Sequence, residues 1–178
     1  MTDYKNLKLI ATSSPHIRGN ETTRSLMLDV VIAMVPALVA AVIVFGIRAL
    51  TLTAVSVVAC IFWEWLYRKI LKKDQTVGDL SCVVTGILLA LNLPVTINPL
   101  IAVFGGVVAI VVVKQLYGGI GCNFLNPALA GRAALLACYA TAMTTWIDPS
   151  ASKAGVLGVG ADIVTAATPM AMMKEGGL

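Results

Sequence analysis

The chain has 178 residues, of which 58% are hydrophobic and 12% charged, and its mean hydropathy of +0.90 lies far above that of a soluble domain. Water is therefore excluded as its main solvent, and the net charge of +4 does not indicate a nucleic-acid partner because the basic residues flank apolar runs. We predict an all-α, polytopic integral membrane protein.

The chain opens with a polar arm over residues 1–25. This arm contains basic side chains such as Lys5 and Arg18, and it lacks the apolar core of a signal peptide. We therefore predict that the arm lies in the cytoplasm and that the first hydrophobic helix acts as its own insertion signal.

Five apolar segments follow and together span residues 26–145. A helix needs about 20 apolar residues to cross a hydrocarbon core about 30 Å thick. The segments cover residues 26–47, 49–67, 80–93, 99–113 and 127–145. The third and fourth are short for full spans, and Asn92-Leu-Pro94 and Asn98-Pro99 interrupt the apolar stretch between them. We expect about five crossings, and interrupted helices in membranes often line a site.

Lysine and arginine residues are distributed unequally between the two sides of these segments. If the segments are alternating crossings, ten basic residues fall on one side and three on the other. The ten are Lys5, Lys8, Arg18, Arg24, Arg68, Lys69, Lys72, Lys73, Lys114 and Arg132, and the three are Arg48, Lys153 and Lys174. Because basic loops stay in the cytoplasm, we predict a cytoplasmic N-terminus and an extracytoplasmic loop over residues 146–178.

The predicted extracytoplasmic loop contains Asp162-Ile-Val-Thr165-Ala-Ala-Thr168. This heptapeptide resembles the signature Asp-x-x-Ser/Thr-Gly/Ala-Ala/Ser-Thr, at which a flavin transferase attaches FMN. The resemblance implies a phosphoester between FMN and Thr168, with Asp162 and Thr165 as recognition residues, while Ala166 and Ala167 leave room for the transferase. The alternative is that Asp162 and Thr165 cap a short helix. The predicted location favours the first interpretation, because these transferases act outside the cytoplasm.

A glycine-rich loop, Tyr117-Gly-Gly-Ile-Gly-Cys-Asn123-Phe-Leu-Asn126-Pro-Ala, precedes the fifth segment. Glycine permits backbone conformations that are closed to other residues, and Asn126 precedes a proline suited to the first turn of a helix. Such a helix start presents free backbone N–H groups and a positive helix end to a carbonyl-rich ring or an anion. The alternative is a plain tight turn.

Two carboxylates lie within the apolar segments. Glu64, between Trp63 and Trp65, is interpreted as part of an interfacial anchor with Arg68 as its partner, and the alternative is a carboxylate in a cation pathway. Asp29 is expected in the first turn of the first helix, where a carboxylate complements the helix dipole. The same cation-pathway alternative applies to it.

The cysteines and the remaining polar residues do not indicate a metal site or a catalytic acid, base or nucleophile. Cysteines occur singly in or beside apolar runs, without the paired spacing of a metal centre, and we interpret them as small buried hydrophobes. They are Cys60, Cys82, Cys122 and Cys138.

Several stretches that occur in a fixed order along the chain resemble one known family. They are Ser13-Ser-Pro-His16-Ile, Asp29-Val-Val-Ile-Ala-Met-Val-Pro36-Ala-Leu, Thr85-Gly-Ile-Leu-Leu-Ala-Leu-Asn-Leu-Pro94, the glycine-rich loop and the flavin motif. Together they resemble the NqrB/RnfD family, which comprises membrane subunits of Rnf electron-transport complexes and of sodium-translocating NADH:quinone reductases. The short N-terminal arm favours the Rnf branch. Family members carry a second set of helices after the flavin threonine, so the chain resembles an N-terminal half.

The resemblance implies a membrane subunit of an ion-translocating ferredoxin:NAD⁺ oxidoreductase. Such a subunit lies in the bacterial inner membrane, carries covalent FMN and moves electrons across or within the membrane, coupled to the movement of Na⁺ or H⁺. Its partners are the other membrane and peripheral subunits of the complex and the extracytoplasmic flavin transferase.

The resemblance also implies a second, non-covalent flavin, riboflavin. Thr85, Asn123 and Asn126 are candidate residues for its site, and Asn92 and Asn98 beside the interrupted helices are further candidates. The alternative role for such polar residues is hydrogen bonding between helices.

Two other functions remain open from the sequence. Broken helices and a loop rich in glycine and asparagine also occur in small-solute channels and transporters. The third possibility is a scaffold that only holds other subunits in the membrane. Both alternatives predict that the protein binds no flavin.

Overall fold

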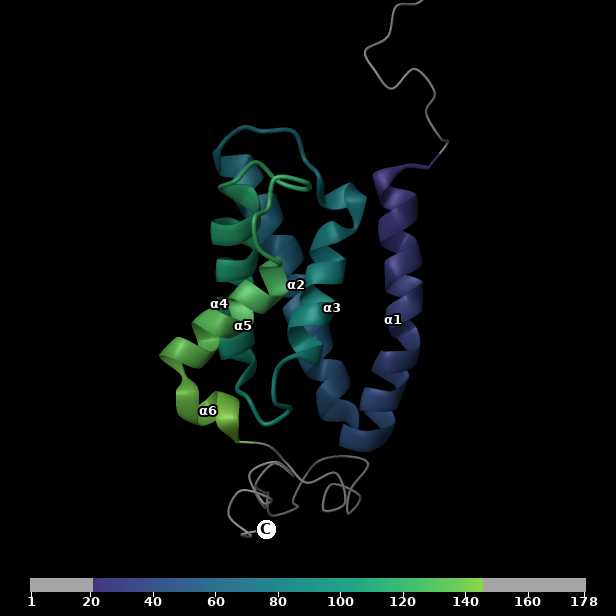
Figure 1. Ribbon diagram of the computed structural model, residues 1–178, viewed down its shortest axis with the longest axis vertical. Coiled ribbons are helices and arrows are strands. Elements are labelled where there is room, and N and C mark those ends of the chain that lie inside the picture. Colours follow the sequence, from purple (N-terminus) through teal and green to yellow (C-terminus); the bar gives the residue numbers. More distant parts are fainter. Residues whose placement is uncertain (1–20, 146–178) are drawn as a thin grey trace, which may run out of the picture.

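The computed structural model describes residues 21–145, so the arm up to residue 20 and the flavin motif lie outside the described residues. Every regular element in the described part is helical, which confirms the predicted all-α class. The helices run alternately up and down (Figure 1). As a result, the start of α1 (Thr23–Phe45) and the end of α6 (Ala140–Thr144) lie at opposite ends of the bundle.

The first two helices form an antiparallel hairpin. The side chain of Thr22 caps α1 by accepting a hydrogen bond from a backbone N–H in its first turn. The helix ends at Gly46, whose φ of 75° turns the chain directly into α2 (Ile47–Ile70). Both helices are long and apolar enough to cross a membrane. The predicted segments 26–47 and 49–67 are therefore placed correctly, although both helices begin earlier than predicted.

Shorter helices follow the hairpin. A 3₁₀ turn, η2 (Val77–Asp79), leads into α3 (Ser81–Leu91). After the proline-containing break, α4 (Pro99–Val107) continues as the π-helix η3 (Val108–Gln115). The side chain of Asn98 caps α4 by accepting a backbone hydrogen bond. The predicted interruption and the two short segments around it are confirmed.

The fifth predicted segment is divided into two helices. Asn126 caps α5 (Pro127–Cys138), whose first residue is a proline, as the sequence indicates. At Tyr139 the backbone has φ −130° and ψ 49°, outside the helical region, and the chain resumes as α6. The prediction of one continuous segment over 127–145 is wrong, because the apolar composition continues through the break and hides it.

Small residues allow these helices to approach one another closely. A Cβ atom at Gly86 of α3 would lie 2.7 Å from the Cα of Val57 in α2. On the same contact, Ser56 Oγ donates a hydrogen bond of 2.9 Å to the carbonyl oxygen of Gly86. A Cβ atom at Gly131 of α5 would lie 2.9 Å from the carbonyl oxygen of Gly105 in α4. Close backbone approach through small residues is typical of helix packing in membranes.

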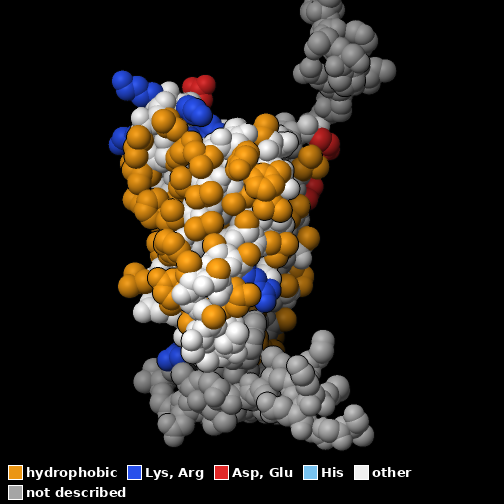
Figure 2. Space-filling view, turned by 60° about the vertical axis from the view of Figure 1, so that its left-hand side comes forward, with side chains coloured by type: hydrophobic (Ala, Val, Ile, Leu, Met, Phe, Trp, Pro, Cys, Tyr) orange, Lys and Arg blue, Asp and Glu red, His pale blue; other side chains and the backbone are white. Residues whose placement is uncertain are grey.

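The outer surface of the described bundle is largely apolar. Ile43 of α1 is 77% exposed and Val58 of α2 is 64% exposed. Figure 2 shows apolar side chains over the middle of one face, with most of the charged side chains gathered at the end where α2 terminates. An apolar surface of this extent suits lipid rather than water. The chain is an all-α membrane protein, and the count of about five crossings stays a prediction.

Candidate functional site

The main candidate site is a cavity of about 480 Å³ at the end of the bundle where α1 begins. We call it the loop cavity, because the glycine-rich loop before α5 forms one of its walls. Pockets for small ligands and cofactors typically have volumes of about 300–1,000 Å³. Most of the lining is apolar or glycine, and the polar side chains that line it are Ser81, Thr85, Lys114, Asn123 and Asn126. This combination is typical of a site for a small ligand or cofactor.

The three residues predicted for a second flavin, Thr85, Asn123 and Asn126, all line the loop cavity. Thr85 lies in α3, where its hydroxyl donates a hydrogen bond of 2.9 Å to the carbonyl oxygen of Ser81. The oxygen of that hydroxyl can still accept a hydrogen bond. Asn126 uses its side-chain oxygen to cap α5, so its amide N–H groups are not needed for the cap. The structure thus brings together residues that lie up to 41 positions apart in the sequence.

Asn123 combines a place in the lining of the loop cavity with an unsatisfied polar atom. Its Oδ1 atom is buried and has no hydrogen-bond partner among the described residues. A buried acceptor left unsatisfied costs about 1–3 kcal/mol. An N–H or O–H group of a ligand that reached this atom would satisfy it.

The glycine-rich loop adopts backbone conformations that favour glycine. Gly118, Gly119 and Gly121 have φ values of 109°, 101° and 86°. The N–H of Gly119 donates a hydrogen bond of 2.9 Å to the carbonyl oxygen of Lys114, which ties the loop to the end of η3. These glycines therefore shape the wall of the cavity that holds Asn123.

A buried ion pair lies directly behind this cavity. The Lys114 ammonium is 2.6 Å from Glu64 Oε2, and it also donates a hydrogen bond of 2.6 Å to Ser81 Oγ. The other carboxylate oxygen of Glu64 accepts a hydrogen bond of 2.8 Å from the Thr76 hydroxyl. Side-chain exposure is 2% for Lys114 and 0% for Glu64. Charges at this depth are costly unless paired and hydrogen-bonded, and both conditions are met here.

The π-helix η3 accounts for the inward position of Lys114. Val113, Lys114 and Gln115 are consecutive and all buried. A regular α-helix on the surface of a bundle normally buries one stripe and exposes the residues between. The wider π turn changes this periodicity, and π-helical turns occur frequently at functional sites.

The predicted surroundings of Glu64 are wrong. The interfacial-anchor interpretation placed this carboxylate beside Arg68, but Glu64 is fully buried and bonds to Lys114. Arg68 instead donates a hydrogen bond of 2.6 Å to the carbonyl oxygen of Asp74. Of the flanking tryptophans, Trp65 is exposed, with the ammonium of Lys69 4.4 Å from its ring centroid, as expected for an anchor.

Lys114 and Arg132 bracket the loop between η3 and α5, as predicted, with Lys114 buried in η3 and Arg132 half-buried in α5. Without these two, the predicted cytoplasmic side still carries more basic residues than the opposite side. The position expected for Asp29 is wrong. Asp29 lies beyond the first turn of α1, since this helix begins at Thr23.

Asn92 and Asn98 do not line the loop cavity. Asn92 donates a hydrogen bond to the carbonyl oxygen of Leu88, and its own oxygen accepts one of 3.2 Å from Arg132. This contact between α3 and α5 confirms the alternative role of interhelical hydrogen bonding for Asn92. Asn98 lies at the opposite end of α4 from the loop cavity.

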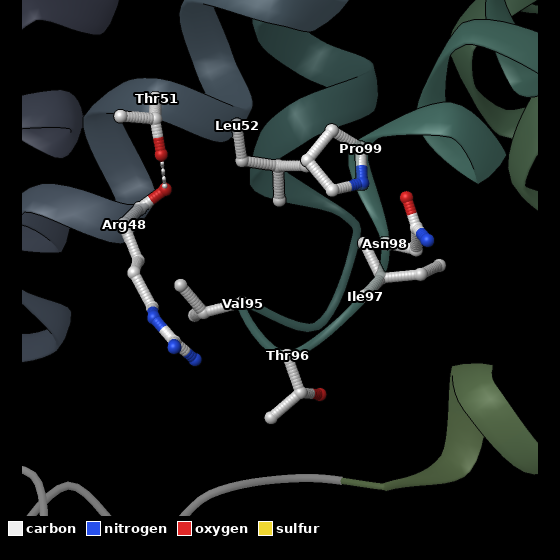
Figure 3. A pocket seen from close by; sticks show the side chains of 8 residues that line it. All are labelled: Arg48, Thr51, Leu52, Val95, Thr96, Ile97, Asn98 and Pro99. Carbon is white, nitrogen blue, oxygen red and sulfur yellow. Dashed lines mark hydrogen bonds between the residues drawn. The ribbon is translucent and has the colours of Figure 1, made fainter. Parts of the chain in front are cut away.

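Asn98 lines a second cavity of about 440 Å³, which we call the proline cavity because Pro99 forms part of it. Figure 3 shows its lining, with the side chain of Arg48 along one side of the opening and Asn98 on the other. Thr51 donates its hydroxyl proton to the Arg48 carbonyl oxygen at 2.9 Å. None of the described polar residues that line this cavity is buried, in contrast to the loop cavity.

The cysteines fall into two groups. Cys60 and Cys82 are buried and pack with Ile110, as interpreted from the sequence. Cys122 and Cys138 are exposed, so the same interpretation is wrong for them. Within residues 21–145, no three histidine, cysteine or acidic side chains gather closely enough to hold a metal ion.

Sequence reasoning missed the pairing of Glu64 with Lys114. Both residues are isolated charges in apolar sequence. Ionisable residues inside a membrane commonly pair with one another, so their isolation is the one signal that points to the pair. Fifty positions separate them, however, and only the packing of η3 against α2 joins them.

The fold and the site together define an all-α membrane protein with a polar cavity and a buried ion pair at one end of its helical bundle. Residues 10–177 match the family described as NQR2, RnfD, RnfE, and the chain belongs to this family.

Curated proteins that are similar to this chain include the D subunits of ion-translocating complexes. The D subunit of the Na(+)-translocating ferredoxin:NAD(+) oxidoreductase complex of Acetobacterium woodii is 47% identical over 170 residues, which are 96% of this chain and 51% of the relative. The D subunit of the proton-translocating ferredoxin:NAD(+) oxidoreductase complex of Clostridium ljungdahlii is 40% identical over 97% of this chain and 50% of the relative. The D subunit of the ion-translocating oxidoreductase complex of Shewanella amazonensis is 34% identical over 91% of this chain and 52% of the relative. The chain thus spans about half the length of these relatives.

Proposed function

We propose that the chain is part of a membrane subunit of an ion-translocating ferredoxin:NAD⁺ oxidoreductase, and that it carries two flavins. Family membership and the names of the relatives support the type of complex. The observation that carries the flavin proposal is the loop cavity, where Thr85, Asn123 and Asn126 meet. The other membrane and peripheral subunits of the complex are its partners, and the bacterial inner membrane is its location.

The first flavin is a non-covalent riboflavin in the loop cavity. The residues present fit an isoalloxazine ring, because the cavity combines apolar walls with a buried acceptor on Asn123 that has no partner among residues 21–145. The ring has carbonyl groups for donors such as the Asn126 amide and an N–H group for the Asn123 oxygen. When bound, the flavin supplies the electron-transfer chemistry, and the protein fixes its position and tunes its potential.

The second flavin is FMN bound covalently to Thr168. Its attachment relies on the motif that begins at Asp162 and includes Thr165 and Ala167, all of which lie outside the described residues. The unequal distribution of basic residues supports an extracytoplasmic position for this motif, where a flavin transferase reaches it. The coupling ion is Na⁺ or H⁺, as in the names of the two relatives above.

Two measurements on the full-length protein test these assignments. After co-expression with the transferase, the denatured protein shows in-gel flavin fluorescence, and Thr168→Ala abolishes it. Thr141→Ala, which alters an exposed threonine of α6, keeps it. Fluorescence that persists in Thr168→Ala contradicts the covalent site, and a wild-type protein without fluorescence contradicts the covalent flavin.

The non-covalent flavin is released into the supernatant when the native protein is denatured, so it is measured separately. Asn123→Ala removes the buried acceptor and is expected to lower the amount of released riboflavin at least several-fold. Gln75→Ala, in the exposed turn after α2, is the control and leaves it unchanged. Equal riboflavin in both variants rejects the loop cavity as the site.

A further inference from the structure

The charge distribution around the loop cavity is asymmetric. Of the described residues that line the cavity, Lys114 carries a charge and the others are neutral. Its counter-ion, Glu64, is bonded to the ammonium but does not line the cavity. The positive partner of the ion pair therefore belongs to the cavity lining, and the negative partner lies behind it in α2.

The ammonium is held in this position by several groups. Glu64 and Ser81 each lie 2.6 Å from Nζ, and the carboxylate itself is fixed by Thr76. Ser81 also lines the cavity, so the hydroxyl that accepts a hydrogen bond from the ammonium belongs to a lining residue. A charge fixed before the ligand arrives needs no rearrangement when the ligand changes its own charge.

We propose that Lys114 is a positioning residue that makes the loop cavity favour the reduced form of its ligand over the oxidised form. This inference rests on the proposed binding of riboflavin in the same cavity. An isoalloxazine ring that gains an electron without a proton gains one negative charge, and a nearby ammonium stabilises that charge. Glu64 acts through Lys114 by orienting the ammonium toward the cavity.

The size of the expected preference depends on how far the Glu64 carboxylate cancels the effect of the Lys114 ammonium on the ligand. An isolated ammonium about 5 Å from a ligand charge would favour the reduced form by more than a hundredfold at an effective dielectric constant of about 20, and the more distant carboxylate removes part of this effect. We expect a preference of roughly tenfold to remain. A tenfold preference raises the potential of a two-electron couple by about 30 mV.

The test measures the affinity of added riboflavin for the full-length protein in detergent, once with oxidised riboflavin and once with chemically reduced riboflavin under anaerobic conditions. Thr168→Ala is the background, so that covalent FMN does not contribute to the signal. The main variant is Glu64→Gln/Lys114→Met, which removes both charges together and leaves neither one unpaired. Lys114→Arg retains the positive charge and is the matched control.

We expect the double variant to lose about tenfold more affinity for reduced riboflavin than for oxidised riboflavin, and Lys114→Arg to keep most of the preference. An equal loss for both forms, or no loss, overturns the role of Lys114 while leaving riboflavin binding intact as a proposal. A background protein that binds neither form overturns both the proposed cavity flavin and this inference. A Lys114→Arg protein that behaves like the double variant also overturns it, because the positive charge is then not the cause.

Discussion

Replacing Lys114 with methionine tests the cost of leaving a charge unpaired inside the bundle. The substitution removes two hydrogen bonds and the counter-ion of a carboxylate that is fully buried. Removing one partner of a buried ion pair typically costs about 3–5 kcal/mol of stability. Because Thr76 still donates to Glu64 in the variant, we expect a loss near the lower end, about 3 kcal/mol.

The double variant Glu64→Gln/Lys114→Met should behave differently from the single one. It replaces the pair with neutral side chains of similar length, and such replacements are often neutral or stabilising. We expect its stability to lie within about 1 kcal/mol of the wild type or above it. The coupling free energy from the cycle of the wild type, two single variants and the double variant is then at least about 2 kcal/mol.

Unfolding in mixed detergent micelles with increasing SDS, followed by tryptophan fluorescence, measures these differences. Trp63 and Trp65 flank Glu64 in α2, so two of the three tryptophans of the chain lie in the relevant part of the bundle. A loss below about 1 kcal/mol for Lys114→Met would refute the reasoning. It would mean that the carboxylate reaches water or another partner, and that the pair is not isolated from solvent as the packing indicates.

The helix packing and the predicted orientation each lead to one further prediction. Gly86→Ala should destabilise the protein by about 1–3 kcal/mol, because the new Cβ would lie 2.7 Å from the Cα of Val57. Gly78→Ala is the control in the same SDS titration, because no atom lies within 4 Å of its new Cβ. Equal unfolding midpoints for the two variants would contradict the close contact. Cys122, exposed in the glycine-rich loop, should react with a membrane-impermeant maleimide in inside-out vesicles and not in right-side-out vesicles. The reverse pattern would disprove a cytoplasmic N-terminus.

The two long helices could be predicted from the sequence because their apolar runs are long and uninterrupted. The exact starts of these helices could not be predicted. Thr22 caps α1, so this helix includes polar residues that precede the apolar run. The division of the last segment at Tyr139 was not predictable either, because composition does not encode where the backbone leaves the helical region. The same limit applies to the π-helix η3, whose sequence is as apolar as that of a regular span.

At the site, the sequence located the candidate residues but not their neighbours. Asn126 and the glycines could be assigned because their roles are local: a helix cap and backbone conformations with positive φ. Asn123 and Thr85 were expected in one cavity through resemblance alone, and the structure places both there. The partner of Glu64 depended on how η3 packs against α2, which no local pattern encodes.

The positions of the two cavities constrain how electrons pass through the proposed subunit. Pro99 lines one cavity and Lys114 the other, at the two ends of the helical segment formed by α4 and η3. Along that segment the two residues are roughly 20 Å apart, at about 1.5 Å per residue. The core between the ends is packed with aliphatic side chains such as Leu89 and Leu135, which have no redox chemistry. If Thr168 carries its flavin on the side of Pro99, we propose that a carrier outside this aliphatic core, in the remainder of the subunit or in another subunit, links the two flavins.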